Sequence, residues 1–239
     1  MQNIINGKHV DASDNSVLNI INPYTGRKID TVPNATAKDV KKAVEFAKKA
    51  QHNWKQVPIS KKVELLKIFL NKVGAYEDEL ASTLSKETGK PITQAYAEIG
   101  NIRIGFEAFM EKAKHLYGNV IPAGTEAGQD KTLQLTVREP LGVMVAIIPF
   151  NFPCDLFDQK VAPAILAGNT IIVKPPHQNP LTLIKLVELM HDAGVPNGVV
   201  QVITGEGKKT GEALSTHPDV HGITFTGSTK AGTAVYEKG

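Results

Sequence analysis

The chain has 239 residues, 41% of them hydrophobic and 21% charged, and its 27 basic and 24 acidic residues leave a formal net charge of +3. This composition is typical of a globular protein that is long enough to bury a full core in one or two domains. The small positive excess, without a Lys/Arg block, disfavours nucleic acid as the main partner. No apolar run approaches the roughly 18 residues of a membrane span, and the N-terminus does not resemble a signal peptide, so we expect a cytoplasmic protein without a membrane partner.

Turn residues and apolar spacing predict hairpins followed by helices at the N-terminus. An Asn-Gly pair at residues 6–7 marks the turn of one β-hairpin, and residues 23–26 mark the turn of a second. From residue 34 to 117 apolar residues recur with helical spacing in four segments, and Gly89 is placed to end the third. We expect residues 1–117 to be the hairpin and helix part of the same domain as the sheet that follows.

Residues 118–140 differ from the segments on either side. Their first part is rich in glycine and polar residues, whereas "TLQLTVR" alternates like a strand with one wet face. This pattern predicts a β arm that stands away from the core. On pattern alone, a surface hairpin and an oligomer contact are equally well supported.

From residue 141 onward, short apolar strands alternate with amphipathic helices. The predicted strands cover residues 143–148, 170–173, 199–203 and 222–225. Such alternation is typical of right-handed βαβ units that build a parallel sheet. The predicted fold class is therefore α/β, a Rossmann-like parallel sheet with flanking helices, preceded by β-hairpins and helices and by a protruding β arm.

Ligands bind beyond the carboxyl ends of the strands in such sheets, so the residues after each strand carry the functional signal. Asn151 follows the first strand, Lys174 begins the turn after the second, and glycine-rich turns at 204–207 and 226–229 follow the third and fourth. Glycine-rich turns that open helices present backbone N–H groups to an anion, and a lysine adds a positive charge. Each feature alone is also typical of an ordinary turn or a surface lysine. Their convergence on one sheet edge predicts a nucleotide site.

The sequence offers little support for other chemistry. It contains no G-x-S-x-G elbow, and with one cysteine it has no Cys/His cluster, so no metal site is expected. The same count excludes an internal disulfide framework. Cys154 lies at a predicted helix start, which lowers the pKa of a thiol, but a lone cysteine is more often buried and inert. We expect buried packing for Cys154.

Several motifs together resemble the N-terminal half of the aldehyde dehydrogenase superfamily. They are "PFNFP", "ILAGNTIIVKPP", "AGVPNGVVQVITG" and "ITFTGSTKAG", and the opening "INGKHVD" matches as well, so the resemblance covers essentially the whole chain. It implies NAD(P)-dependent oxidation of a small-molecule aldehyde to a carboxylic acid through a cysteine thiohemiacetal and thioester. By resemblance, Asn151 is the catalytic donor that stabilises the developing oxyanion.

The resemblance also implies which residues contact the dinucleotide. The expected cofactor-binding residues are Ile148, Phe150, Lys174, Pro176, His177, Gly205, Gly207, Lys208, Phe225, Gly227 and Ser228. Residues 141–239 become the βαβ cofactor-binding part, and residues 118–140 an oligomerisation arm of a homodimer or homotetramer. The family's nucleophilic cysteine and general-base glutamate lie downstream of the 226–229 turn and its helix, so we expect these 239 residues alone to be inactive.

One departure from the family concerns the choice between NAD and NADP. Members that favour NAD often carry a glutamate three residues after the lysine that holds the ribose, and here that position is His177. Without a carboxylate nothing repels a 2′-phosphate, and Lys174 and Lys208 are available to pair with one. The resemblance therefore predicts NADP or dual use.

Two other functions agree with the same residues. One is the branch of the family that passes the thioester to coenzyme A. The other is a non-catalytic nucleotide-binding or scaffold protein. The identity of the aldehyde is not encoded in these motifs.

Overall fold

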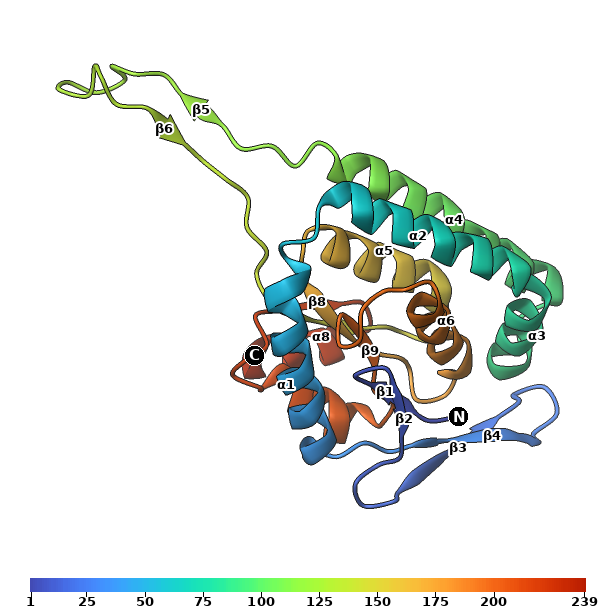
Figure 1. Ribbon diagram of the computed structural model, residues 1–239. Helices are drawn as coiled ribbons and strands as arrows, with labels where there is room; N and C mark the ends of the chain where they lie inside the picture. Colours follow the sequence, from blue (N-terminus) through green and yellow to red (C-terminus); the bar gives the residue numbers. More distant parts are fainter.

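A six-stranded sheet carries the candidate site in the computed structural model, which describes residues 1–239, and its strand order is β10-β7-β8-β9-β1-β2 (Figure 1). The strands are β1 (Asn3–Ile5), β2 (Lys8–Val10), β7 (Val143–Ile147), β8 (Thr170–Lys174), β9 (Val200–Val202) and β10 (Gly222–Phe225). The four strands β10, β7, β8 and β9 run parallel to one another. The predicted Rossmann-like parallel sheet is confirmed.

The first hairpin extends this sheet, which the sequence pattern did not predict. Strand β1 pairs antiparallel with β2 and also with β9, through Ile4 and Val202. The turn between β1 and β2 places Asn6 at φ 52° and Gly7 at φ 71°, the left-handed pair that a two-residue hairpin requires. The second hairpin, β3 (Val17–Ile21) with β4 (Lys28–Pro33), forms a separate two-stranded sheet.

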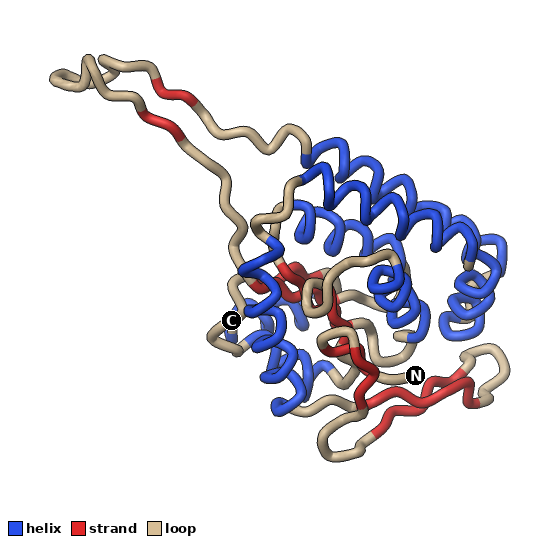
Figure 2. Tube along the Cα trace, viewed as in Figure 1, coloured by secondary structure: helices blue, strands red, loops and turns tan.

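Alternate side chains of each central strand enter different apolar clusters on the two faces of the sheet. In β8, Ile171 and Val173 belong to the larger cluster, whereas Ile172 belongs to the smaller one. Helices α5 (Pro153–Leu166) and α6 (Leu181–Asp192) contribute to the larger cluster, whereas helix α1 (Ala37–Trp54) contributes to the smaller one, apart from Trp54 at its end, which joins the larger. The backbone of these helices and of the sheet is drawn in Figure 2. This alternation explains why the strands read as continuous apolar runs, since both faces are covered.

Three further helices pack over α5 and α6 as an outer layer. They are α2 (Ile59–Ala75), α3 (Glu77–Thr88) and α4 (Ile92–Ala113). Phe69 of α2, Phe106 of α4 and Phe157 of α5 are fully buried, and the Phe106 ring lies 5.1 Å from Phe69 and 6.4 Å from Phe157 between ring centroids. As predicted, Gly89 ends α3 with φ 76°. No helix combines the length and apolarity needed to cross a membrane.

The arm leaves the body of the molecule between α4 and β7, and Figure 1 shows it projecting far from every other element. Only β5 (Val120–Ile121) and β6 (Gln134–Leu135) pair within it, so the strand expected over "TLQLTVR" is shorter than the pattern indicates. The alternating apolar residues have no core to face, because Leu133, Leu135 and Val137 are 74, 60 and 77% exposed.

Two helices follow the glycine-rich turns. The segment after β9 starts as a π-helix, η1 (Gly207–Gly211), and continues as α7 (Glu212–Ser215), where the sequence predicts one regular helix. Helix α8 (Thr229–Lys238) follows β10. The wide first turn allows Thr210 to donate from Oγ1 to the carbonyl of Ala35 at 2.7 Å, which ties η1 to the start of α1.

A buried acid between α4 and α5 makes the folding stability depend on pH. Asp158 is 3% exposed, and a Cβ added to Gly105 on α4 would lie 2.2 Å from its Oδ2 atom. Its Oδ1 atom has no hydrogen-bond partner. Burial, aided by the negative charge of Asp155, raises the pKa of Asp158 from 3.8 to about 7.

We therefore expect the free energy of unfolding to fall as pH rises from about 4 to about 7. The unfolded chain ionises Asp158 first, so the folded state binds more protons across this window. Asp158→Asn should remove the part of this dependence that Asp158 contributes and raise the free energy of unfolding at pH 8 by about 1–3 kcal/mol, with no gain at pH 4. Glu87, whose pKa burial also raises to about 7, keeps its own part of the dependence in this variant. Urea unfolding across pH 4–8 measures this, with the exposed Asp130→Asn as control. An equal gain at all pH values would contradict the titration of Asp158.

Candidate functional site

The strand register brings three predicted turns to one edge of the sheet. Ile147 at the end of β7 pairs with Lys174 at the end of β8 and with Phe225 at the end of β10. Because these strands are parallel, the residues that follow them meet above the same edge. The convergence inferred from the sequence is thus a property of the fold.

A cavity of 540 Å³ opens at this edge, between the ends of β7, β8 and β10 and helices η1, α7 and α8. Its lining residues are Ile147, Lys174, Gly207, Lys208, Gly211, Glu212, Ser215, Phe225, Ser228, Lys230, Ala231, Ala234, Val235 and Lys238. Five of the predicted cofactor-binding residues are among them, namely Lys174, Gly207, Lys208, Phe225 and Ser228. We call this cavity the strand-end cavity.

Lys174 is the buried cation of the strand-end cavity. It is 5% exposed, and its ammonium donates to the carbonyl of Pro175 at 3.2 Å. Burial lowers the pKa of Lys174 to about 8. An ammonium in this environment has donors to spare, so it suits a ligand that brings hydroxyl or phosphate oxygens. The interpretation of Lys174 as a surface lysine is wrong.

The start of helix α8 adds a second feature suited to an anion. Ser228 caps α8 by accepting from the backbone N–H of Ala231 at 3.3 Å, and the positive end of the helix dipole lies at the strand-end cavity. A Cβ added to Gly227 would lie 2.6 Å from the Phe225 ring. Gly227 is therefore needed for the approach of the turn to Phe225, although it does not line the cavity itself.

Other residues that were predicted to bind the cofactor do not line the strand-end cavity but lie in or next to the turns around it. Gly205 has φ 151°, and a Cβ there would lie 1.9 Å from Thr210 Oγ1, so it permits the close packing of η1. Ile148 is 3% exposed and Pro176 is also buried. The backbone N–H of Ile148 donates to the carbonyl of Lys174 at 3.1 Å and continues the sheet. The predicted contacts of these residues with a cofactor stay predictions.

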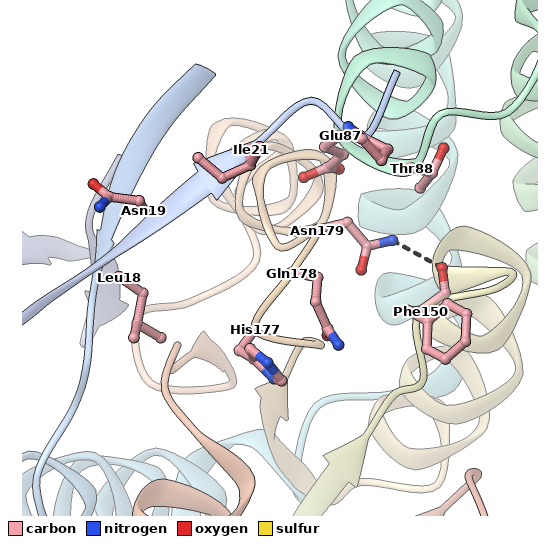
Figure 3. A pocket seen from close by; sticks show the side chains of 10 residues that line it. Leu18, Asn19, Ile21, Glu87, Thr88, Phe150, His177, Gln178 and Asn179 are labelled. Carbon is pink, nitrogen blue, oxygen red and sulfur yellow. Dashed lines mark hydrogen bonds between the residues drawn. The ribbon is translucent and has the colours of Figure 1, made fainter. Parts of the chain in front are cut away.

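Phe150 and His177 line a different cavity, of 470 Å³, shown in Figure 3. This cavity lies between β3, the end of α3 and the segment after β8, and its other lining residues are Leu18, Asn19, Ile21, Pro23, Glu87, Thr88, Gln178 and Asn179. Burial and the charge of Lys174 lower the pKa of His177, so its imidazole is neutral near pH 7. Positive charge for a phosphate must therefore come from the lysines of the strand-end cavity, among them Lys174 and Lys208.

Asn151 lies in the loop between β7 and α5, as predicted, two residues before α5 begins. The residue is exposed, and its backbone carbonyl accepts from Lys90 Nζ at 3.1 Å. Asn151 lines neither of the two cavities. A neutral amide held at this position is suited to donate to a charged oxygen.

Cys154 is fully buried, as expected. Desolvation, followed by the charges of Glu98 and Glu87, raises the pKa of the Cys154 thiol. A buried thiol with a raised pKa does not form the thiolate that attacks a carbonyl.

The sequence argument against a metal overlooked one spacing, since His217 and His221 are four residues apart. Between them, Asp219 pairs with Lys48, and His221 Nδ1 accepts from the backbone N–H of Val143 at 3.2 Å. No group of three or more His, Cys, Asp or Glu side chains in the structure could hold a metal ion.

The sequence analysis missed cavity residues that carry no chemical signature. Ile147 contributes to the strand-end cavity, whereas the motif pointed to Ile148. Alternation along β7 could have found it, because Ile147 is two residues from Val145, whose side chain lies on the α1 face. Gly211 lies close to Lys174, since a Cβ there would be 3.5 Å from Lys174 Cε. Lys230 and Lys238 add a third and a fourth lysine to the lining.

Residues 9–239 match the Aldehyde dehydrogenase family. The chain belongs to the aldehyde dehydrogenase family. Succinate-semialdehyde dehydrogenase [NADP(+)] from Escherichia coli is 35% identical over 237 residues, which are 99% of this chain and 48% of that protein. The predicted family is confirmed, and this chain spans about half the length of the curated relatives it matches.

Solved structures of family members share the fold. The NADP complex of an NADP-dependent glyceraldehyde-3-phosphate dehydrogenase from Bacillus halodurans matches with a TM-score of 0.96 and 34% identity, over 99% of this chain and 50% of that chain. An NAD-dependent aldehyde dehydrogenase from Sinorhizobium meliloti matches with a TM-score of 0.93 and 36% identity, over 99% of this chain and 47% of that chain. Relatives of this architecture thus include both NADP- and NAD-dependent enzymes.

Proposed function

We propose that this chain supplies the dinucleotide site and the oxyanion donor for NAD(P)-dependent oxidation of an aldehyde to a carboxylic acid. The observation that carries the proposal is the strand-end cavity, which is lined by a buried lysine, by a capped helix start and by the last residue of β7, the strand whose following loop carries Asn151. Family membership supports the same reaction. We also propose the predicted division into residues 1–117, 118–140 and 141–239.

The residues of the strand-end cavity fit a dinucleotide. Lys174 has unused donors for ribose hydroxyls, and the start of α8 at Ser228 has N–H groups for a phosphate. An added Cβ at Gly207 would meet nothing within 4 Å, so the turn leaves room for a ligand. When bound, the nicotinamide accepts a hydride from the substrate. Asn151 donates from its carboxamide to the substrate oxygen, which becomes negatively charged as a nucleophile adds to the carbonyl.

We use the term complete gene product for the product of the complete reading frame that contains these residues. Its activity tests the proposal. Incubation with short aldehydes and NAD or NADP should give aldehyde-dependent reduced cofactor and free carboxylic acid. Acyl-CoA formation that requires added coenzyme A would instead assign the acylating branch. Cofactor binding without reduction by any aldehyde would favour the non-catalytic alternative.

Lys174→Met should weaken cofactor binding by about 10-fold to 100-fold, because a hydrogen bond from a charged group contributes about 1.5–3 kcal/mol. Calorimetry with NADP and NAD on the 239-residue chain measures the change. Lys61→Met is the control, since Lys61 is an exposed lysine of α2 paired with Glu64. Equal affinities of the Lys174 variant and the wild type would contradict the assignment of this cavity.

We expect the chain to bind NADP at least as tightly as NAD near neutral pH. His177→Glu should shift the affinity ratio toward NAD, because a carboxylate accepts from the 2′-hydroxyl and repels a 2′-phosphate. Calorimetry with both cofactors measures the ratio, and Gln178→Glu controls for an added charge one residue away. Tenfold tighter NAD binding by the wild type, or an unchanged ratio in His177→Glu, would show that this position does not discriminate.

We further propose that the arm contacts a second copy of the chain in a homodimer or homotetramer. Its exposed apolar residues, with Leu133 74% and Val137 77% exposed, support an assembly contact over a free surface hairpin. Light scattering should give a dimer or tetramer for the wild type and a smaller species for Leu133→Ser/Val137→Ser.

A further inference from the structure

The loop from residue 148 to 152 makes few contacts of its own that hold it in place. It joins β7 to α5, and Phe150, Asn151 and Phe152 are all exposed. Phe152 occupies the N-cap position of α5 and provides no side-chain cap. The first N–H groups of α5 therefore need partners from elsewhere.

Three side chains from other segments supply these contacts along the loop backbone. Asn179 donates from Nδ2 to the carbonyl of Phe150 at 2.8 Å, as Figure 3 shows. Lys90 donates from Nζ to the carbonyl of Asn151 at 3.1 Å. Glu98 accepts at Oε1 from the backbone N–H of Cys154 at 2.8 Å, which caps α5 from outside the helix.

Lys90 and Glu98 also bind each other. Their ion pair is almost fully buried, with side chains 11% and 2% exposed. The Lys90 ammonium lies 4.7 Å from the centroid of the Phe152 ring, so it also contacts the residue after Asn151. A carboxylate this deeply buried depends on its partners, so removal of either side chain leaves the other charge uncompensated. The ion pair therefore behaves as one unit that holds the loop at two points.

We propose that Lys90, Glu98 and Asn179 form a backbone clamp that aims the Asn151 carboxamide at the substrate oxygen. This inference rests on the proposed function of Asn151. The clamp fixes the carbonyls of residues 150 and 151 and the N–H of residue 154, so only the side-chain torsions of Asn151 are left free. All three are positioning residues, because none of them contacts the reacting atoms.

The clamp also explains why helices α3 and α4 belong to the site. Lys90 lies between α3 and α4, and Glu98 lies on α4, more than 50 residues before the loop in the sequence. Asn179 precedes α6, in the segment that follows β8. The segment that carries the oxyanion donor is thus held by side chains from the outer helical layer and from the segment after β8. Displacement of a catalytic group by 1 Å can cost about 100-fold in rate.

The first test measures the order of the loop in the complete gene product. Lys90→Met removes one donor but leaves the buried charge of Glu98 without a partner, which can prevent folding. The double variant Lys90→Met/Glu98→Gln removes both charges, so it is tested beside the single variant. Asn179→Leu removes the third contact. Amide hydrogen exchange of residues 150–156 should be at least tenfold faster in each variant, while exchange in β8 stays unchanged. The control is again Lys61→Met, an exposed ion-pair lysine far from the loop in sequence.

The second test is a double-mutant cycle on aldehyde oxidation. We expect Lys90→Met/Glu98→Gln to lower kcat at least tenfold, with the KM for NADP within threefold of the wild type. In an Asn151→Ala background the same pair of substitutions should lower kcat less than threefold, because the group that they aim is absent. A purely structural role would lower the activity by the same factor in both backgrounds.

The outcomes separate the clamp from the proposed function. Unchanged kcat and exchange in a folded Lys90→Met/Glu98→Gln variant would overturn the clamp while leaving Asn151 in its role. If Asn151→Ala leaves kcat unchanged, the role of Asn151 is wrong, and the positioning inference is overturned with it, even where exchange in the loop rises.

Discussion

Asn151→Ala is expected to lower kcat of the complete gene product about 100-fold to 1000-fold, which corresponds to a loss of about 2.7–4 kcal/mol of transition-state stabilisation. The residue is exposed at the mouth of the β7–α5 loop, where its carboxamide is available to a substrate, and its backbone is tied to Lys90. The affinity for NADP should change less than threefold, because Asn151 does not line the strand-end cavity. Steady-state kinetics and calorimetry on the same preparation measure both quantities.

Asn151→Asp provides the matched variant. It keeps the size of the side chain but replaces the donor with a carboxylate, which repels a developing oxyanion, so kcat should fall at least as far as in Asn151→Ala. Asn71→Ala on α2 is a control for the loss of an exposed asparagine outside the loop. If Asn151→Ala raises KM for the aldehyde and leaves kcat unchanged, Asn151 binds the substrate equally in the ground and transition states and does not act as an oxyanion donor.

The parallel sheet and the site at the carboxyl ends of its strands could be predicted from the sequence, because each strand and turn is marked by its own short stretch of residues. Strand β8 is a short apolar run followed at once by Lys174, and both glycine-rich turns open helices, so each element could be recognised without its neighbours. Parallel pairing then places the turns together, because right-handed βαβ crossovers allow only a few strand topologies. The fold and the position of the strand-end cavity follow from the same pattern, whereas only five of the eleven expected cofactor-binding residues line the cavity.

The long-range contacts could not be predicted in this way. Lys90 lies in the connection between α3 and α4 and Glu98 lies on α4, and nothing in the local pattern marks either residue as buried. Their contacts are with each other and with the loop before α5 and its first turn. The separation of His177 from the strand-end cavity is likewise invisible in the motif, because His177 is only three residues from Lys174. In each case the deciding contact joins residues far apart in the chain, for which periodicity carries no information.

Asn151 is the proposed oxyanion donor, whereas Cys154 does not supply a nucleophile, so the chain alone is expected to be inactive. A polypeptide of these 239 residues should form no reduced cofactor from any aldehyde, although we expect it to bind NAD(P). Covalent oxidation of an aldehyde requires a thiolate, and the only thiol of the sequence, Cys154, is buried with a raised pKa. Spectrophotometric assays with NAD and NADP, at pH 7 and pH 9, measure the activity.

Cys154→Ser in the complete gene product tests whether the Cys154 side chain contributes to stability, to the reaction, or to both. Cys154 packs in the larger apolar cluster, and the hydrogen bond from its backbone N–H to Glu98 does not involve the thiol. The substitution buries a hydroxyl and should cost about 1–3 kcal/mol of stability. In the folded fraction, kcat should stay within threefold of the wild type, because the side chain takes no part in the reaction. Loss of kcat by more than 100-fold in a folded Cys154→Ser variant, together with activity of the 239-residue polypeptide, would make Cys154 the nucleophile.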